Sequence, residues 1–450
     1  MTIISQNDYF TKIKYSLVFQ LALKFYSKNN NNRIMWLRIV CRTFNKMILY
    51  YISTLNICST FDTNCWQSIR KLIRMMPNLN CLNLILFDDH FIKPNLSLFF
   101  QSILSDLVKL TSLGIKYNSN GNVNANLLTS DIANLTNLTS LSIETSVTHQ
   151  CVPIFFNLPK LKCLKFQFKT IYEPIKPKKE LFAQVIYSFT QTLLNSNTTL
   201  KKLDLAHNRL KDSEIQLLLP GIEKLTNLTS INFEDNHITD EGIDMLVPII
   251  RKMTKLKAVN FSSNRISFSK YNSFLSILDK LTYLSDLNIG DNFIMKDGFL
   301  ILSPILATLT NLTSLGLDSP RQKITKDLLS SSIAKLTNLK CLNLPYTNFE
   351  VLEKTLPTLT NLMILNLNSH YIKPEQLSLL KPSLIRMTSM TSLTLESNEL
   401  RCLSGVQSLI EIFTRMKHLH FLKIDGFHLG EGKELLLDVF RTMPELRYEL

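Results

Sequence analysis

The chain of 450 residues is poor in glycine and has no long uninterrupted apolar run. Its 11 glycines are few for this length, which argues against glycine-rich loops that cradle nucleotide phosphates. No stretch reaches the ~18 apolar residues that a membrane span needs. The start, MTIISQNDYFTKIKYS, lacks the charged-then-apolar order of a secretory signal. We therefore expect a cytosolic or nuclear protein with no membrane partner.

Residues that would mark a catalytic or metal site are sparse. The eight cysteines are scattered from Cys41 to Cys402 without a CxxC motif, so we expect reduced, buried thiols. The stretch GEGK at 430–433 fails as a phosphate loop, because Phe427 stands where the first glycine belongs. His418, His420 and His428 are interpreted as solvated strand and turn positions rather than as ligands. The sequence thus predicts no enzyme, no cofactor and no metal.

Charge is present and is unevenly distributed. The formal net charge is +14, and residues 1–60 hold eight Lys/Arg against a single acid, Asp8. A basic chain of this kind binds nucleic acid, an anionic membrane or an acidic protein, and a bias toward lysine in the coding sequence is the alternative interpretation.

A leucine pattern, L-x-x-L-x-L, recurs about thirteen times. From Leu200 to Leu312 its first leucine advances by 28 residues each time. Irregular steps on either side of Leu161 indicate a shortened repeat and then an insertion that carries YEPIKPKKE, residues 172–180. A partial unit, MPELRYEL, follows the last repeat. This periodicity predicts one long repeat array, in which neighbouring units together bury a continuous core.

Each repeat combines a strand and a helix. Leu203 and Leu205 alternate with polar or small residues, which predicts a short strand with one buried face. Downstream, apolar residues follow helical spacing, as in Ile243, Leu246, Val247, Ile250 and Met253. In five repeats an asparagine follows the strand and is expected to bond the backbone of its own and the neighbouring repeat; these are Asn208, Asn236, Asn264, Asn292 and Asn398.

This pattern resembles the leucine-rich repeat family of the ribonuclease-inhibitor-like kind. The resemblance implies an α/β solenoid over residues 56–450, a horseshoe with short parallel strands on the concave face and helices on the convex face. In this family the concave face usually binds protein. The side chains expected there are amide-rich and mildly acidic, which argues against nucleic acid: Asp204, Asn232, Glu234, Asn260, Asn288, Asp318, Asn343, Asn366, Glu396 and Asp425. They are equally what short solvated strands tolerate, and that alternative stays open.

The stretch MWLRIVCRTFNKMI, residues 35–48, does not share the repeat pattern. On a helix its apolar residues share one face, and Arg38, Arg42 and Lys46 share the opposite one. Upstream, residues 16–27 predict another short apolar helix. Together they predict a small helical module over residues 12–55, which is too small to hold a large core of its own.

The run IVCRTF at 39–44, with Leu37 before it, resembles the second helix of the F-box. The sequence departs from that family at its start, where Val18 follows Leu17 in place of the usual proline and Gln20 replaces an acid. The resemblance implies that an apolar surface binds the adaptor subunit of a cullin–RING ubiquitin ligase. Its residues would be Leu17, Leu21, Phe25, Ile34, Leu37, Val40, Cys41 and Phe44.

An F-box followed by leucine-rich repeats implies a division of labour. The protein would be the substrate-recognition subunit of an F-box ubiquitin ligase and would catalyse nothing itself. It would hold a protein substrate on the repeats, close to a charged conjugating enzyme. The alternative is a free-standing interaction scaffold, in which the N-terminal helices cap the first repeat, as solenoids require.

Overall fold

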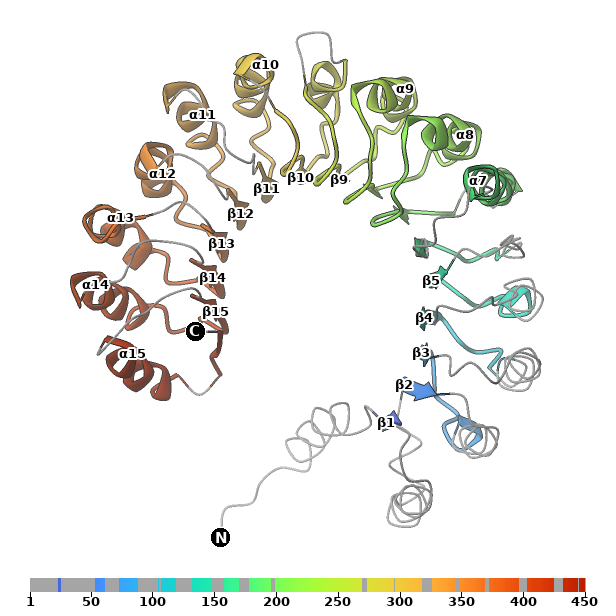
Figure 1. Ribbon diagram of the computed structural model, residues 1–450, viewed down its shortest axis with the longest axis horizontal. Coiled ribbons are helices and arrows are strands. Elements are labelled where there is room, and N and C mark those ends of the chain that lie inside the picture. Colours follow the sequence, from blue (N-terminus) through green and yellow to red (C-terminus); the bar gives the residue numbers. More distant parts are fainter. Residues whose placement is uncertain are drawn as a thin grey trace. The chain divides into compact units, whose positions relative to one another are not determined.

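The computed structural model describes two compact units. Unit 1 comprises residues 1–208 and 217–228, and unit 2 comprises residues 209–216 and 229–450. Within each unit the strands line one side and the helices the other (Figure 1). The described residues are 23–25, 53–60, 73–87, 104, 107–118, 132–146, 158–169, 178–195, 199–268, 273–294, 296–317, 326–344, 349–368, 372–395, 403–424, 432–443 and 445–449.

The strands of unit 1 are parallel, and each pairs with the next. They are β1 (Leu23–Phe25), β2 (Thr54–Thr60), β3 (Cys81–Phe87), β4 (Ser112–Asn118), β5 (Ser140–Ser146), β6 (Cys163–Lys169) and β7 (Lys202–Asp204). Helix α7 (Lys178–Asn195) begins within the last residues of the predicted insertion at 172–180, and residues 172–177 lie outside the described residues. Helix α8 (Asp212–Glu223) is divided between the two units.

Unit 2 repeats the same plan with shorter strands, again parallel and paired in chain order. The strands are β8 (Ser230–Asn232), β9 (Ala258–Asn260), β10 (Asp286–Asn288), β11 (Ser314–Gly316), β12 (Cys341–Asn343), β13 (Ile364–Asn366), β14 (Ser392–Thr394), β15 (Phe421–Lys423) and β16 (Arg447–Glu449). The helices are α9 (Asp240–Ile250), η1 (Leu275–Lys280), α10 (Lys296–Leu306), α11 (Lys326–Ile333), α12 (Phe349–Thr355), η2 (Leu356–Thr358), α13 (Pro374–Arg386), α14 (Leu403–Phe413) and α15 (Gly432–Arg441).

The core lies between the strands and the helices. The leucines that define the pattern are buried; Leu228, Leu256 and Leu312, for example, are 0% exposed. Aromatic rings continue the packing from one repeat to the next, as Phe233 and Phe261 stack with centroids 5.5 Å apart. Because no repeat buries these groups alone, each depends on its neighbour. The predicted fold class, an α/β leucine-rich-repeat solenoid, is confirmed.

The helix signals of the sequence are also found. Asp240 and Glu241 lie in the first turn of α9, where the positive end of the helix dipole favours acids. The predicted apolar face of α9 is buried through Ile243, Leu246 and Ile250. Pro374 begins α13, at a position that needs no N–H donor.

The N-terminal prediction is wrong at one point. Residues 16–27 were expected to form a helix in an all-helical module over 12–55, but Leu23–Phe25 form β1, which pairs with Ile57–Ser59 of β2. The alternation Leu21, Leu23, Phe25 suits a strand with one apolar face, and an unpaired edge of β2 provides hydrogen-bonding partners. Thr54 and Leu55, at the end of the same module, begin β2. Residues 1–22 and 26–52 lie outside the described residues.

Candidate functional site

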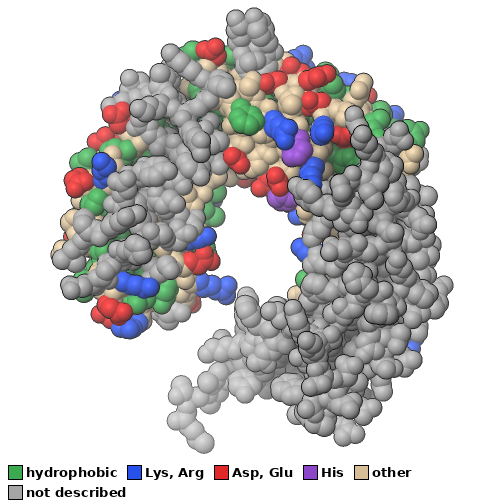
Figure 2. All heavy atoms as spheres, in the orientation of Figure 1, with side chains coloured by type: hydrophobic (Ala, Val, Ile, Leu, Met, Phe, Trp, Pro, Cys, Tyr) green, Lys and Arg blue, Asp and Glu red, His purple; other side chains and the backbone are tan. Residues whose placement is uncertain are grey.

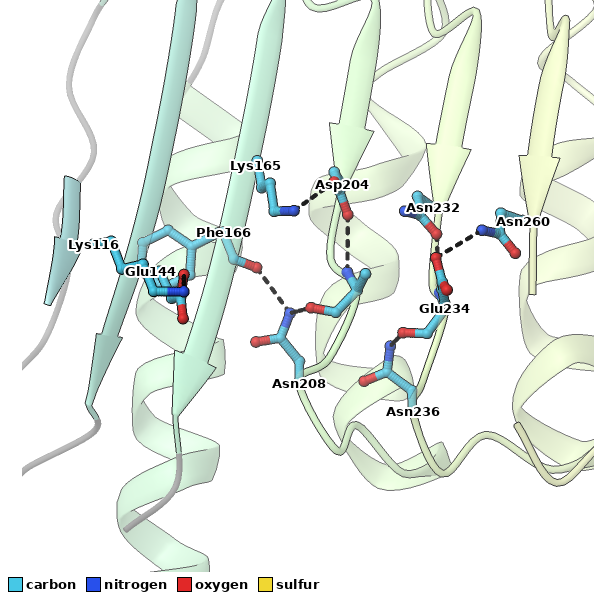
Figure 3. A network of polar contacts seen from close by, with 11 residues as sticks. Lys116, Glu144, Lys165, Phe166, Asp204, Asn208, Asn232, Glu234, Asn236 and Asn260 are labelled. Carbon is cyan, nitrogen blue, oxygen red and sulfur yellow. Dashed lines mark hydrogen bonds and ion pairs between the residues drawn. The ribbon is translucent and has the colours of Figure 1, made fainter. Parts of the chain in front are cut away.

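The asparagine after each strand is a structural residue. Asn236, Asn264 and Asn292 are at most 5% exposed. The Nδ2 of Asn264 donates to the carbonyls of Phe261 (3.0 Å) and, in the preceding repeat, Phe233 (2.8 Å). Its Oδ1 accepts the N–H of Ile238 at 3.1 Å. Bonding to both its own and the neighbouring repeat, as the sequence predicts, is therefore confirmed for these asparagines, and Asn208 does the same in unit 1 (Figure 3). Asn398 lies outside the described residues.

The last residues of the short strands form a second row of side chains on the concave face, here called the middle row. In unit 2 it comprises Asn232, Asn260, Asn288, Gly316, Asn343, Asn366, Thr394, Lys423 and Glu449. The Oδ1 of each bonded asparagine accepts the backbone N–H two residues further on, at 3.0 Å from Asn232 to Glu234 and 2.9 Å from Asn260 to Ser262. Asn288 and Asn366 repeat this bond.

Side chains of the middle row also bond across repeats. The Nδ2 of Asn260 donates to the carboxylate of Glu234 at 3.1 Å (Figure 3), and that of Asn288 donates to the hydroxyl of Ser262 at 3.1 Å. In unit 1 the same region holds ion pairs, Lys165 with Asp204 at 3.5 Å and Lys116 with Glu144 at 2.9 Å. Most of the polar groups that the sequence offered for binding are thus already engaged within the protein.

Asn343 differs from the other asparagines of the middle row. Its Oδ1 is buried and has no hydrogen-bond partner. In the other repeats the partner is an N–H two residues on, and here that residue is Pro345, which has no N–H. A buried acceptor without a donor costs about 1–3 kcal/mol. The sequence of this one repeat therefore removes a bond that its neighbours make.

The residues predicted for binding are placed unevenly. Asp204 lies in β7, and Asn232, Asn260, Asn288, Asn343 and Asn366 lie in the strands of unit 2, with Glu234 directly after β8. Asp318, Glu396 and Asp425 lie outside the described residues, as do the predicted adaptor-binding residues Leu17, Leu21, Ile34, Leu37, Val40, Cys41 and Phe44. Of that set Phe25 alone is described, as part of β1.

Two further rows border the middle row and were missed in the sequence. The first row holds the first residue of each strand, and the preceding row holds the residue before it. In the preceding row of unit 2 stand Thr229, Lys257, Ser285, Thr313, Lys340, Met363, Thr391, His420 and Leu446. Met363 is 37% exposed, and the next residue, Ile364 of the first row, is 44% exposed. Superimposing the repeats would have revealed them, because most other repeats have polar or small residues at these two positions.

Ile364 projects because its neighbours on the sheet are small. In the parallel register it lies between Cys341 of β12 and Ser392 of β14. The N–H groups of Met363 and Ile364 both donate to the carbonyl of Lys340, at 2.8 and 2.9 Å, so a cationic side chain begins directly beside the apolar pair. Exposed apolar side chains gathered within a polar face are typical of interaction sites.

Cys341 is an unreactive feature of this surface. Burial raises the pKa of its thiol, the charge of Asp286 adds to the increase, and a hydrogen bond with Ser314 opposes it. A nucleophilic cysteine needs a lowered pKa instead, because the thiolate is the reactive form.

Within the described residues, no three His, Cys, Asp or Glu side chains are placed to hold a metal ion. No described helix combines the length and apolar character of a membrane-spanning segment.

The chain is similar to known proteins in part of its sequence. A family profile described as "Leucine Rich repeat" matches residues 196–213 and 224–247. No curated protein matches the chain significantly. Among solved structures, an internalin (inlF) from Listeria monocytogenes is similar, with 20% identity, a TM-score of 0.37 and 92% of both chains covered. A Bacteroides fragilis protein has 15% identity and a TM-score of 0.40, over 65% of this chain and 86% of that chain.

The strands, the buried leucines and the matched profile define the class of this molecule. Its fold is that of a leucine-rich-repeat solenoid, and its candidate binding surface is the concave strand face of unit 2.

Proposed function

We propose that the protein is a non-catalytic interaction scaffold that holds a protein partner on the concave face of unit 2. The observation that carries this proposal is the exposed pair of Met363, directly before β13, and Ile364, its first residue, at positions where most other repeats have polar or small residues. Apolar side chains that lose their water contact drive most protein association, and a few such residues dominate the affinity. The raised pKa of the Cys341 thiol disfavours a thiolate nucleophile at this position beside the apolar pair.

A photo-crosslinking amino acid at position 364 of the full chain tests the scaffold proposal. We expect a defined protein adduct from position 364 and none from position 379, since Leu379 is 59% exposed but lies on helix α13. With the purified partner, Ile364→Asp should weaken binding at least about tenfold, and the matched variant Leu379→Asp should leave it unchanged. Equal effects of both substitutions would rule out the concave face as the binding surface.

The finer proposal is that this scaffold is the substrate-recognition subunit of an F-box (cullin–RING) ubiquitin ligase in the cytosol or nucleus. It is supported by the resemblance of IVCRTF at 39–44, in a chain that continues into leucine-rich repeats. The resemblance that supports this proposal is limited to residues 34–48 of the predicted module at 12–55, because Leu23–Phe25 form a strand and a helical F-box has no strand there. The apolar face of that stretch would bind the adaptor, and the repeats would bind the substrate.

Capture of the full chain by the purified adaptor subunit tests this finer proposal. The double substitution Leu37→Asp with Val40→Asp should abolish capture while the thermal unfolding of the repeats stays unchanged. Lys46→Asp on the opposite, basic face of the same stretch is the matched control and should still be captured. If the unsubstituted chain is never captured, the ligase assignment falls and the scaffold remains.

A further inference from the structure

In four consecutive repeats of unit 2, the stretch from the end of one helix through the turn to the next strand holds no acid, and in three of the four it holds cations. These stretches, residues 334–344, 356–368, 386–395 and 413–424, are here called the cationic segments; Glu396 and Asp425 directly follow two of them. They hold six Lys/Arg and no Asp or Glu: Lys335, Lys340, Arg386, Arg415, Lys417 and Lys423. Lys423 is paired with Glu449 at 3.3 Å. In the described part of the chain, the other five have no carboxylate within ion-pair distance.

The exposed apolar pair lies inside this cationic region. Met363 and Ile364 lie in the segment 356–368, which contains no charged residue. Their backbone N–H groups both donate to the carbonyl of Lys340. On the other side, the N–H of Thr391 donates to the carbonyl of Met363 at 2.7 Å, and that of His420 donates to Thr391 at 2.9 Å. A partner that covers Ile364 therefore also lies beside Lys340 on one side; on the other side Thr391 is uncharged, and the cation of that repeat, Arg386, lies at the end of α13.

We infer that this surface binds an acidic protein segment that carries one apolar side chain. Its carboxylates would face Lys340 and the lysine and arginine side chains of the other cationic segments, and its apolar residue would pack on Met363 and Ile364. Charge complementarity of this kind mainly sets specificity and association rate, whereas the apolar anchor supplies affinity. The inference rests on the proposed function, since it names the class of partner that the concave face of unit 2 would take.

A second cationic group of unit 2 shows why the apolar pair matters. Arg251, Lys252, Lys255 and Lys257 cluster around the turn before β9, where the first row holds Ala258. Charge alone therefore does not distinguish β13 from β9, but the exposed isoleucine does. Nucleic-acid surfaces stack bases on aromatic rings, which Met363 and Ile364 do not provide. A flat bilayer suits side chains on an outer surface, and β13 lies on the inner, strand side of unit 2 (Figure 1).

Binding of short fluorescent peptides to the full chain, followed by anisotropy, tests the inference. The probe is a peptide rich in Asp and Glu with one central Leu. The control probes are the same peptide with Leu→Ser, a Lys-rich peptide that keeps the Leu, and a single-stranded oligonucleotide. We expect the acidic Leu peptide to bind best, with affinity falling as salt is raised. Ile364→Ser should weaken this peptide about fivefold or more and should barely change binding of its Leu→Ser form.

Matched variants separate the position from the charge. Lys340→Glu should weaken the acidic Leu peptide about fivefold or more, whereas Lys257→Glu, at the equivalent position of β9, should change its binding less than twofold. Leu379→Ser on α13 controls for loss of an exposed apolar side chain. Equal effects of Lys340→Glu and Lys257→Glu, absence of peptide binding, or oligonucleotide binding that ignores Ile364→Ser would each overturn the inference. Crosslinking at position 364 to a partner without acidic segments would overturn it as well, while leaving the scaffold function intact.

Discussion

Replacing Asn343 by alanine should cost far less stability than the same change at other asparagines of the middle row. The Oδ1 of Asn260 accepts bonds from the N–H and hydroxyl of Ser262, at 2.9 and 2.7 Å, and its Nδ2 donates to Glu234 at 3.1 Å. Each such bond contributes about 0.5–1.5 kcal/mol, so Asn260→Ala should cost about 1–3 kcal/mol. The Oδ1 of Asn343 is buried without a donor, so Asn343→Ala removes a penalty and should be neutral or slightly stabilising.

The comparison is measured by urea unfolding of the full chain, with hydrogen exchange at Leu344 as a local readout, because repeat arrays open in parts. A second substitution tests the cause directly. Pro345→Ala supplies the missing N–H, and in that background Asn343→Ala should become costly by about 1 kcal/mol. The reasoning would be refuted by an Asn343→Ala variant that loses as much stability as Asn260→Ala, or by a cycle with no coupling between the two positions.

Three further changes have defined outcomes. Asn264→Ala should cost about 1–3 kcal/mol in urea unfolding, because it leaves the buried N–H of Ile238 without its acceptor and removes one of the two amide donors to each of the carbonyls of Phe233 and Phe261; an unchanged unfolding free energy would contradict the structural role. Gly298→Ala should lower the melting temperature, since its Cβ would stand 2.6 Å from the carbonyl oxygen of Phe268, a backbone atom that does not move aside easily; Gly298→Ser should be at least as damaging. Alkylation of Cys341, followed by mass spectrometry, should be slower at pH 8 than that of a peptide thiol and should rise at higher pH, because burial and Asp286 raise its pKa; a rate equal to the peptide's would contradict this.

The repeat architecture was legible in the sequence because it depends on local spacing. The sequence shows a period of 28 residues, recurring leucines and, in five repeats, an asparagine after the strand. Each of these patterns was a strong signal because it recurs. The strand at Leu23–Phe25 was missed because a short apolar stretch suits either a helix or a strand, and pairing with β2 decides between them.

The candidate surface was harder to predict. The sequence drew attention to Asn232, Asn260 and Asn288, whose amides turn out to bond within the protein. Those bonds join residues 26 or more positions apart, or a side chain to its own backbone, and composition alone does not reveal them. Met363 and Ile364 were overlooked because an isoleucine next to leucines is usually predicted to lie in the core. Their exposure depends on the register of β13 with its neighbouring strands, which the sequence does not show.

The bonds of Asn264 and Asn292 bear on how such an array changes length. The Nδ2 of Asn292 donates to the carbonyl of Phe261, and its Oδ1 accepts the N–H of Ile266. Asn264 makes the same two bonds to Phe233 and Ile238. The two sets of partners are the same residue types at the same places, 28 positions apart. Excising residues 256–283 would therefore present Asn292 with the same residue types as hydrogen-bonding partners. Whole repeats of this stretch are interchangeable with respect to these bonds, so evolution can change the number of repeats without changing the asparagine contacts between them.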